Sequence, residues 1–296
     1  MFKFIAWLFS PIVAVLDFIT KYFKTIVFLS IVYYFSYGSN QDVLSDSNAS
    51  YANLQKIELF GPILSADKVL EDIEKAKMND NIKGVLFIVN SPGGAVSPSV
   101  ELMYAIKELR AIKPVVAYAS GTMASGSYYA SIYANKIYAN PGSMIGSIGV
   151  IFQGANMEEL MQKIGIKMQT VKVGSYKEAG TPTREWNTYE RAELEKVIND
   201  TYDIFIEDVS KARGLKKSDH KLYADAHIFT SRQAKKVGLI DEVGNITAAK
   251  KYLILLSKVK DPVWHKQDKF DAFMEKIISE VVSNFAISMQ GGLKAY

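Results

Sequence analysis

The feature that most constrains the fold is a pair of short apolar runs separated by one helical segment. Val85–Val89 and Val115–Ala119 are continuous apolar stretches, as expected of strands buried on both faces of a sheet. Between them, Ser97–Arg110 has apolar residues at helical spacing, with serine as the predicted cap and proline in the first turn. A strand–helix–strand order favours a right-handed crossover between parallel strands. The sequence therefore predicts an α/β domain with a mostly parallel sheet and flanking helices.

The same periodicities predict further elements on both sides of this unit. The expected strands are Lys56–Phe60, Lys136–Ala139, Ile151–Phe152 and Ile166–Val173, and the expected helices are Asp67–Met78, Glu158–Ile164 and Thr188–Arg213. Asp67 is expected to cap its helix, and Gly214 to close the longest one. The predicted domain spans residues 55–258.

The N-terminal segment, residues 1–38, is predicted to be a membrane anchor. It is strongly apolar, and we expect an interfacial helix followed by a transmembrane helix built on the run Thr25–Tyr37. Lysines precede this run and few follow it, so the positive-inside rule places the N-terminus in the cytoplasm and the domain outside. A removable signal peptide is the alternative.

Two further segments complete the predicted organisation. Residues 39–54 are polar and are expected to be a linker. Residues 259–296 are expected to be a tail, with an amphipathic helix over Phe270–Met289 that would pack on the domain, on a neighbouring subunit or on the bilayer surface.

Composition excludes several classes of function. The net charge is only +4 and no basic stripe with interleaved aromatic residues occurs, which argues against nucleic-acid binding. The chain has no cysteine, so thiolate catalysis and cysteine-based zinc sites are excluded. Its three histidines, His220, His227 and His265, do not follow a metal-ligand spacing. We therefore expect no metal and no cofactor.

A candidate nucleophile follows the second apolar run, in Gly121–Ala130. Small residues at Ala124, Ser125 and Gly126 permit a tight turn from strand to helix, which would lift the side chain of Ser125 into a cleft. Backbone N–H groups at such a helix start would face a developing negative charge. The alternative is that Ser125 serves only as a helix N-cap.

A serine hydroxyl needs a base, and lysine is the preferred candidate here. A lysine amine acts as a base only where its surroundings lower the pKa well below about 10.4. Lys177 follows an apolar stretch in Gly174–Glu178, so a partly buried position is expected. A solvated surface lysine is the alternative, and a Ser-His-Asp triad is not excluded by the sequence.

Four motifs together resemble the signal peptide peptidase A family of serine proteases. They are Val89–Gly94, Ala124–Tyr129, Asn140–Gly149 and Gly174–Lys177, and with Gly238–Asp241 they cover roughly residues 56–249. The resemblance implies a Clp/crotonase fold. The Ser-Pro-Gly-Gly element alone is shared with that broader fold, whereas the ordered combination is specific to the family.

The resemblance also implies roles for individual residues. Ser125 matches the nucleophile, Lys177 the general base and Ser147 a hydroxyl that orients the lysine, while the backbone N–H groups of Gly93 and Gly126 match the oxyanion hole.

Two positions next to these residues need comment. Ser127 departs from the glycine common in the family, and we expect little loss of activity from it. Glu178 follows the proposed base. We expect its carboxylate to point away from Lys177, because a nearby carboxylate raises the pKa of a lysine and so favours the charged ammonium form.

The resemblance finally implies a function and a location. The expected activity is that of a serine endopeptidase, anchored by a single span in the bacterial inner membrane with its protease domain on the extracytoplasmic side. It would cleave signal-peptide remnants and other short apolar segments, contact membrane lipid and form a homo-oligomer with sites near protomer contacts. The alternatives are a general membrane-protein quality-control protease, a crotonase-type acyl-CoA enzyme and an inactive scaffold.

Overall fold

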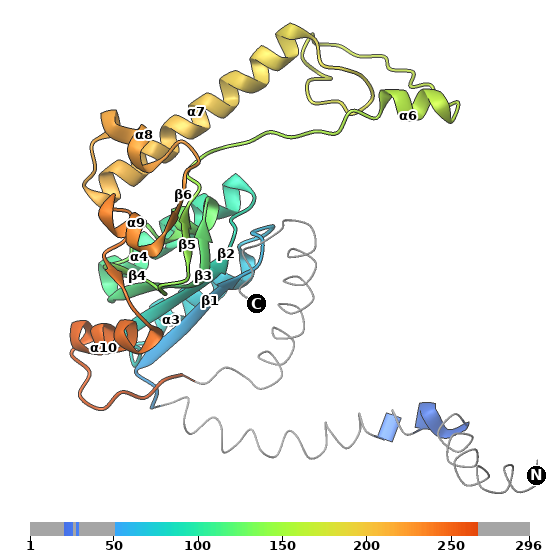
Figure 1. Cartoon of the computed structure of the whole chain (residues 1–296). Helices are drawn as coiled ribbons and strands as arrows, with labels where there is room; N and C mark the ends of the chain where they lie inside the picture. The colour runs from blue at the N-terminus through green and yellow to red at the C-terminus, as the bar shows by residue number, and fades with distance from the viewer. Residues whose placement is uncertain (1–20, 26–27, 30–50, 266–296) are drawn as a thin grey trace, which may run out of the picture. The chain divides into compact units, whose positions relative to one another are not determined.

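The computed structural model describes residues 21–25, 28–29 and 51–265 (Figure 1). The chain divides into two compact units, Met1–Ala52 and Asn53–Tyr296. In the first unit, residues 21–25 and 28–29 are helical and exposed. Most of the predicted anchor and linker, and the predicted tail helix, lie outside the described residues. Within the described part of the chain, no helix has the length and apolar character that a membrane crossing requires.

The second unit is built around a seven-stranded mixed sheet, most of whose neighbouring strands are parallel. Its main path runs in the order β1-β2-β3-β4-β7, while β5 pairs with β3 and with β6. Only the β5–β6 pairing is antiparallel among the described strands. The strands are β1 (Leu54–Phe60), β2 (Gly84–Ser91), β3 (Val115–Ala124), β4 (Lys136–Ala139), β5 (Met144–Gly146), β6 (Ile228–Thr230) and β7 (Glu242–Val243). The predicted α/β class with a mostly parallel sheet is confirmed.

Helices cover both faces of this sheet (Figure 1). They are α3 (Asp67–Met78), α4 (Val96–Ile112), α5 (Gly126–Ser131), α6 (Glu158–Lys163), α7 (Thr188–Arg213), α8 (His220–Tyr223), α9 (Ser231–Lys236) and α10 (Ile246–Ser257), with a 3₁₀ turn at Lys217–Asp219. On one face, Ala249 and Leu253 of α10 pack on alternate residues of the central strands, among them Leu86 and Ile88. Phe87 and Val89 alternate with these and are fully buried, as predicted for a strand covered on both faces.

The segment between β5 and α7 does not join the sheet. In Figure 1 it leaves the strands, carries α6 and lies beyond the N-terminal end of α7, which returns the chain to the sheet. We call residues 150–187 the arm. Many of its apolar side chains are exposed, and Val171 and Val173 are almost fully so.

Several boundaries differ from the prediction. The alternation at Ile166–Val173 is typical of a strand, but this stretch and Ile151–Phe152 are irregular, because no sheet edge lies beside them. Helix α4 begins at Val96 rather than at a Ser97 cap. Ala66, not Asp67, holds the N-cap position of α3, and Ser65 Oγ accepts the Asp67 N–H at 3.1 Å.

Candidate active site

Ser125 occupies a strained turn between β3 and α5. Its φ of 51° and ψ of −125° place a non-glycine residue in a sparsely populated region, which costs about 1–3 kcal/mol. Two backbone bonds hold the turn, from Ser125 N–H to Gly146 O at 2.8 Å and from Tyr129 N–H to Ser125 O at 3.0 Å. Ser125 stands at the N-cap position, yet its hydroxyl makes no capping hydrogen bond. The geometry therefore favours the interpretation that the Ser125 hydroxyl is available for chemistry over the interpretation that Ser125 only caps the helix.

Ser127 reinforces this turn from inside the core. The residue is fully buried, and its hydroxyl accepts the Ala124 N–H at 2.9 Å. Its own hydrogen faces two carbonyl acceptors, Ser91 O at 2.7 Å and Ala124 O at 2.9 Å. The Ser127 hydroxyl thus links the ends of β2 and β3 next to Ser125.

Gly93 lies against the Ser125 turn. Its φ is +90°, and a Cβ added there would stand 2.6 Å from Gly126 N and 2.8 Å from Ala124 O. The Gly93 carbonyl accepts the Ile63 N–H at 2.9 Å, and the Gly93 N–H donates to Ser91 Oγ at 3.2 Å. Only glycine fits this conformation and this close approach, so the backbone of Gly93 can lie beside the Ser125 turn.

A narrow pocket opens beside Ser125, and α7 forms one wall of it. Its lining side chains are mostly apolar or small and include Val96, Ser99, Tyr129, Val150, Thr201 and Phe205. Tyr129 stacks on Phe205 with ring centroids 4.2 Å apart, and its hydroxyl donates to Asp208 Oδ2 at 2.5 Å. Burial, together with this carboxylate acceptor, raises the pKa of Tyr129 above its usual range. The Tyr129 side chain in the pocket wall is therefore a neutral phenol that donates its hydrogen to Asp208.

Ser147 is brought next to the Ser125 turn by strand pairing. Gly146, the residue before it, pairs with Ala124 across β5 and β3. Ser147 is half-buried, has a φ of 49°, and donates its N–H to His227 O at 2.7 Å. Ser125 and Ser147 thus follow the ends of two neighbouring parallel strands.

Lys177 is not brought to this place. It lies in the arm, in a turn where its N–H donates to Gly174 O at 3.2 Å, and its side chain is exposed. The expectation of a partly buried lysine is therefore wrong for one copy of the chain. Among the described residues, no hydrogen bond or ion pair joins Ser125 to Lys177 or to a histidine.

Comparison with known proteins identifies the family. The model of Peptidase family S49 matches residues 107–260, a range that contains both Ser125 and Lys177. The chain belongs to this family. A candidate protease of Methanocaldococcus jannaschii is 43% identical over 194 residues, which are 66% of this chain and 61% of that protein. A candidate signal peptide peptidase SppA of Enterococcus faecium is 31% identical over 227 residues, covering 70% of this chain and 65% of that protein.

These matches span less than two thirds of either relative's own length. Among solved structures, a mutant of a membrane-bound stomatin-specific protease overlays with a TM-score of 0.48 and 16% identity, covering 73% of this chain and 94% of that one. The resemblance to signal peptide peptidase A proteases that the motifs indicated is confirmed by the family match and by the name of the E. faecium relative.

Two charged residues that the sequence reasoning did not single out join the arm to α7: Arg184 lies in the arm and Glu190 in the first turn of α7. Arg184 forms two hydrogen bonds, each of 2.8 Å, with the carboxylate of Glu190. Glu190 in turn accepts the Asn187 N–H at 2.9 Å, which is half of a capping box at the start of α7. The pattern Asn-x-x-Glu before a helix was the available signal. The Glu178 carboxylate is engaged by Lys172 and Arg184, in agreement with the expectation that it points away from Lys177.

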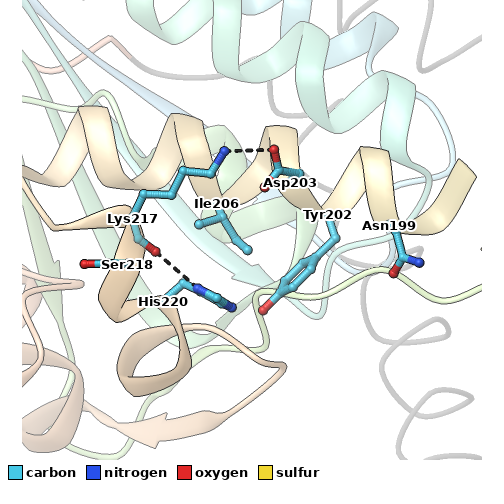
Figure 2. Close-up of a pocket in the computed structure, with 7 residues that line it drawn as sticks. All are labelled: Asn199, Tyr202, Asp203, Ile206, Lys217, Ser218 and His220. Atoms are coloured by element: carbon cyan, nitrogen blue, oxygen red, sulfur yellow. Dashed lines mark hydrogen bonds and ion pairs between the residues drawn. The ribbon is translucent and has the colours of Figure 1, made fainter. Parts of the chain in front are cut away.

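A second hollow lies between α7 and the Lys217–Tyr223 region (Figure 2). His220 lines it, with Nδ1 3.1 Å from Lys217 O and its ring edge-on to Tyr202 at 6.2 Å. Lys217 Nζ pairs with Asp203 at 2.8 Å. No residue of the Ser125 turn lines this hollow, so His220 is not placed beside Ser125. Among the residues that the structure describes, no acidic or histidine cluster is placed to hold a metal ion.

Proposed function

We propose that the protein is a serine endopeptidase in which Ser125 is the nucleophile and Lys177 the general base. The observation that carries this proposal is the strained Ser125 turn, whose hydroxyl makes no capping bond and lies beside a narrow pocket. Strain of this kind is kept at functional sites when the surrounding structure over-determines it. Family membership supports the same chemistry.

The proposed reaction is acyl transfer in two steps. Ser125 Oγ attacks the scissile carbonyl carbon while the Lys177 amine takes the hydroxyl proton. The N–H groups of Gly93 and Gly126 stabilise the oxyanion, the first of them by exchanging its 3.2 Å bond to Ser91 Oγ. The lysine ammonium then returns the proton to the leaving amine, and water hydrolyses the acyl-enzyme. Ser147, beside the turn, orients the lysine.

Lys177 is proposed to come from a neighbouring copy of the chain. The arm lies away from the sheet that carries Ser125 (Figure 1). Several of its apolar side chains, including Ile151, Val171 and Val173, are exposed. Burying them against another subunit would stabilise a homo-oligomer through the hydrophobic effect.

The proposed substrates are short apolar segments, including signal-peptide remnants. The mostly apolar lining of the Ser125 pocket supports this preference. Anchoring through residues 1–38, with the domain outside the cytoplasm and against membrane lipid, would bring the site to such substrates. General membrane-protein quality control is the broader form of the same proposal.

Hydrolysis of a signal-peptide-like substrate by the full chain tests the proposal. Ser125→Ala and Lys177→Ala should each remove activity by at least about a thousandfold without unfolding the domain. Lys177→Arg should fail as well, since a guanidinium does not give up its proton. His227→Gln should remain active.

Mixing two inactive variants tests where the lysine comes from. Subunits with Ser125→Ala and subunits with Lys177→Ala, unfolded and reassembled together, should regain part of the activity if each site takes its lysine from a neighbour. No recovery would place both residues in one chain. An inert parent with equally inert variants would instead favour a scaffold or an acyl-CoA enzyme.

A further inference from the structure

The turn that carries Lys177 is tied to the start of α7 by charged side chains of alternating sign. Lys172 Nζ donates to Glu178 Oε2 at 2.6 Å, and Arg184 Nη2 donates to the same oxygen at 3.1 Å. Arg184 also holds Glu190 through two bonds of 2.8 Å. We call Lys172, Glu178, Arg184 and Glu190 the arm clamp.

Glu190 fixes one end of the arm clamp to the helix. Its side chain is fully enclosed and also accepts the Asn187 N–H. The bonds from Arg184, and then the one from Asn187, lower the pKa of Glu190 to about 2, so the carboxylate is charged at neutral pH. A two-bond arginine–carboxylate pair adds directional rigidity to its charge, which makes this end a firm attachment.

Both neighbours of Lys177 in the sequence are held against α7. Glu178 is bound by the arm clamp, and the Tyr176 ring lies edge-on to Tyr189 of α7, with centroids 5.6 Å apart. The charged and titratable groups gathered around Glu178 are Lys172, Arg184, Tyr189 and Glu190. Lys177 itself is exposed, and no described hydrogen bond or ion pair involves its amine.

We propose that Lys172 and Arg184 are positioning residues that keep the Glu178 carboxylate from pairing with the Lys177 amine. An unpaired carboxylate within about 4–6 Å of an amine favours the ammonium form, and an ammonium takes no proton from serine. The two cations therefore serve the reaction by occupying the one acidic group that adjoins the base. This inference rests on the proposed function for its consequence, whereas the arm clamp itself is independent of it.

Competitive labelling of the full chain with trace acetic anhydride tests the proposal without relying on turnover. Mass spectrometry of the Lys177 peptide would follow acetylation against pH and give the midpoint of its rise. In Lys172→Gln we expect this midpoint to move up by about half a pH unit or more, because Glu178 loses its closer cation. Adding Glu178→Gln to this variant should return the midpoint to that of the parent.

Lys163→Gln is the matched control. It removes the same charge from the arm, but Lys163 pairs with Glu159 of α6 and not with Glu178. Its midpoint should equal that of the parent. Equal midpoints in Lys172→Gln and Lys163→Gln, or a shift that persists after Glu178→Gln, would overturn the proposal. Arg184→Lys is a second variant that keeps a positive charge near the enclosed Glu190 and should move the midpoint less than Lys172→Gln.

The pH profile of kcat/KM separates this inference from the proposed function. If Lys177 is the base, the pH at which kcat/KM rises should move in Lys172→Gln by the same amount as the labelling midpoint. If the labelling midpoint moves but the pH dependence of kcat/KM does not, the proposed role of the arm clamp stands and Lys177 is rejected as the base.

Discussion

The Ser125 turn and the arm are stabilised in opposite ways. Around Ser125, buried strands and backbone hydrogen bonds hold a strained turn, the buried Ser127 hydroxyl braces it, and Gly93 lies so close that a Cβ there would stand 2.6 Å from Gly126 N. In the arm, apolar side chains are exposed and order comes from the arm clamp and from ring contacts. The comparison teaches that the conformation of the proposed nucleophile, Ser125, is fixed by the core of one chain, while the proposed base, Lys177, lies on an exposed surface suited to contact with another subunit.

The largest expected effect on activity comes from adding a side chain beside the Ser125 turn. Gly93→Ala would place a Cβ 2.6 Å from Gly126 N at a φ of +90°, so we expect at least about a hundredfold loss of activity, comparable to losing an oxyanion donor. Gly165→Ala is the control, since that arm glycine has a φ of +78° with nothing within 4 Å. Peptide hydrolysis and thermal unfolding would be measured for both. Equal losses would mean that backbone strain alone, not the close approach, accounts for Gly93.

The next effect concerns the attachment of α7 to the sheet. Asp241 accepts from Ile137 N at 2.7 Å and pairs with Arg213, which is 9% exposed. Asp241→Asn should lower the free energy of unfolding by about 3 kcal/mol, because it breaks a largely buried ion pair. Lys211→Gln, at an exposed pair with Glu207 on the same helix, should cost less than about 0.5 kcal/mol. Denaturant titration checks both, and similar costs would contradict the assignment of Asp241 as the attachment.

Acid should loosen the arm before the sheet. The pKa of Glu190 is lowered from 4.5 to about 2, so its contribution to stability is complete above about pH 4.5 and is lost as the pH falls toward 2. Hydrogen exchange at the first turn of α7 should therefore speed up in this window while β2 stays protected. In Glu190→Gln this pH dependence should vanish, and its persistence would assign the effect to another carboxyl group.

The smallest effect on the single chain should come from the exposed arm. Val171→Ser should change the free energy of unfolding of one subunit by less than about 0.5 kcal/mol, since Val171 is fully exposed. It should nevertheless weaken self-association, measured by analytical ultracentrifugation, if the arm packs on a neighbour. Met78→Ser, an exposed position at the end of α3, should alter neither quantity. Unchanged association in Val171→Ser would remove the arm from the proposed interface.

The limits of sequence reasoning differ between the same two regions. Continuous apolar runs predicted β2 and β3, because strands buried on both faces need apolar residues at every position. Helical spacing of apolar residues predicted α3 in the same way. The alternation of apolar and polar residues at Ile166–Val173 is the pattern of a strand, but a strand forms only beside the edge of a sheet, and the arm has no such edge next to it. The capping box at Asn187 was readable, whereas the pairing of Arg184 with both Glu178 and Glu190 was not.

The sequence by itself determined the α/β class, the central strands and the identity of the candidate residues, since periodicity and motif order are local properties. Tertiary structure alone decided that Ser125 adopts a positive φ, that Ser147 adjoins it through the pairing of β5 with β3, and that Lys177 is exposed on an arm. These depend on which distant segments meet. The contacts between these segments supply the free energy that holds the strained turn, and this total cannot be predicted from any single stretch of the sequence.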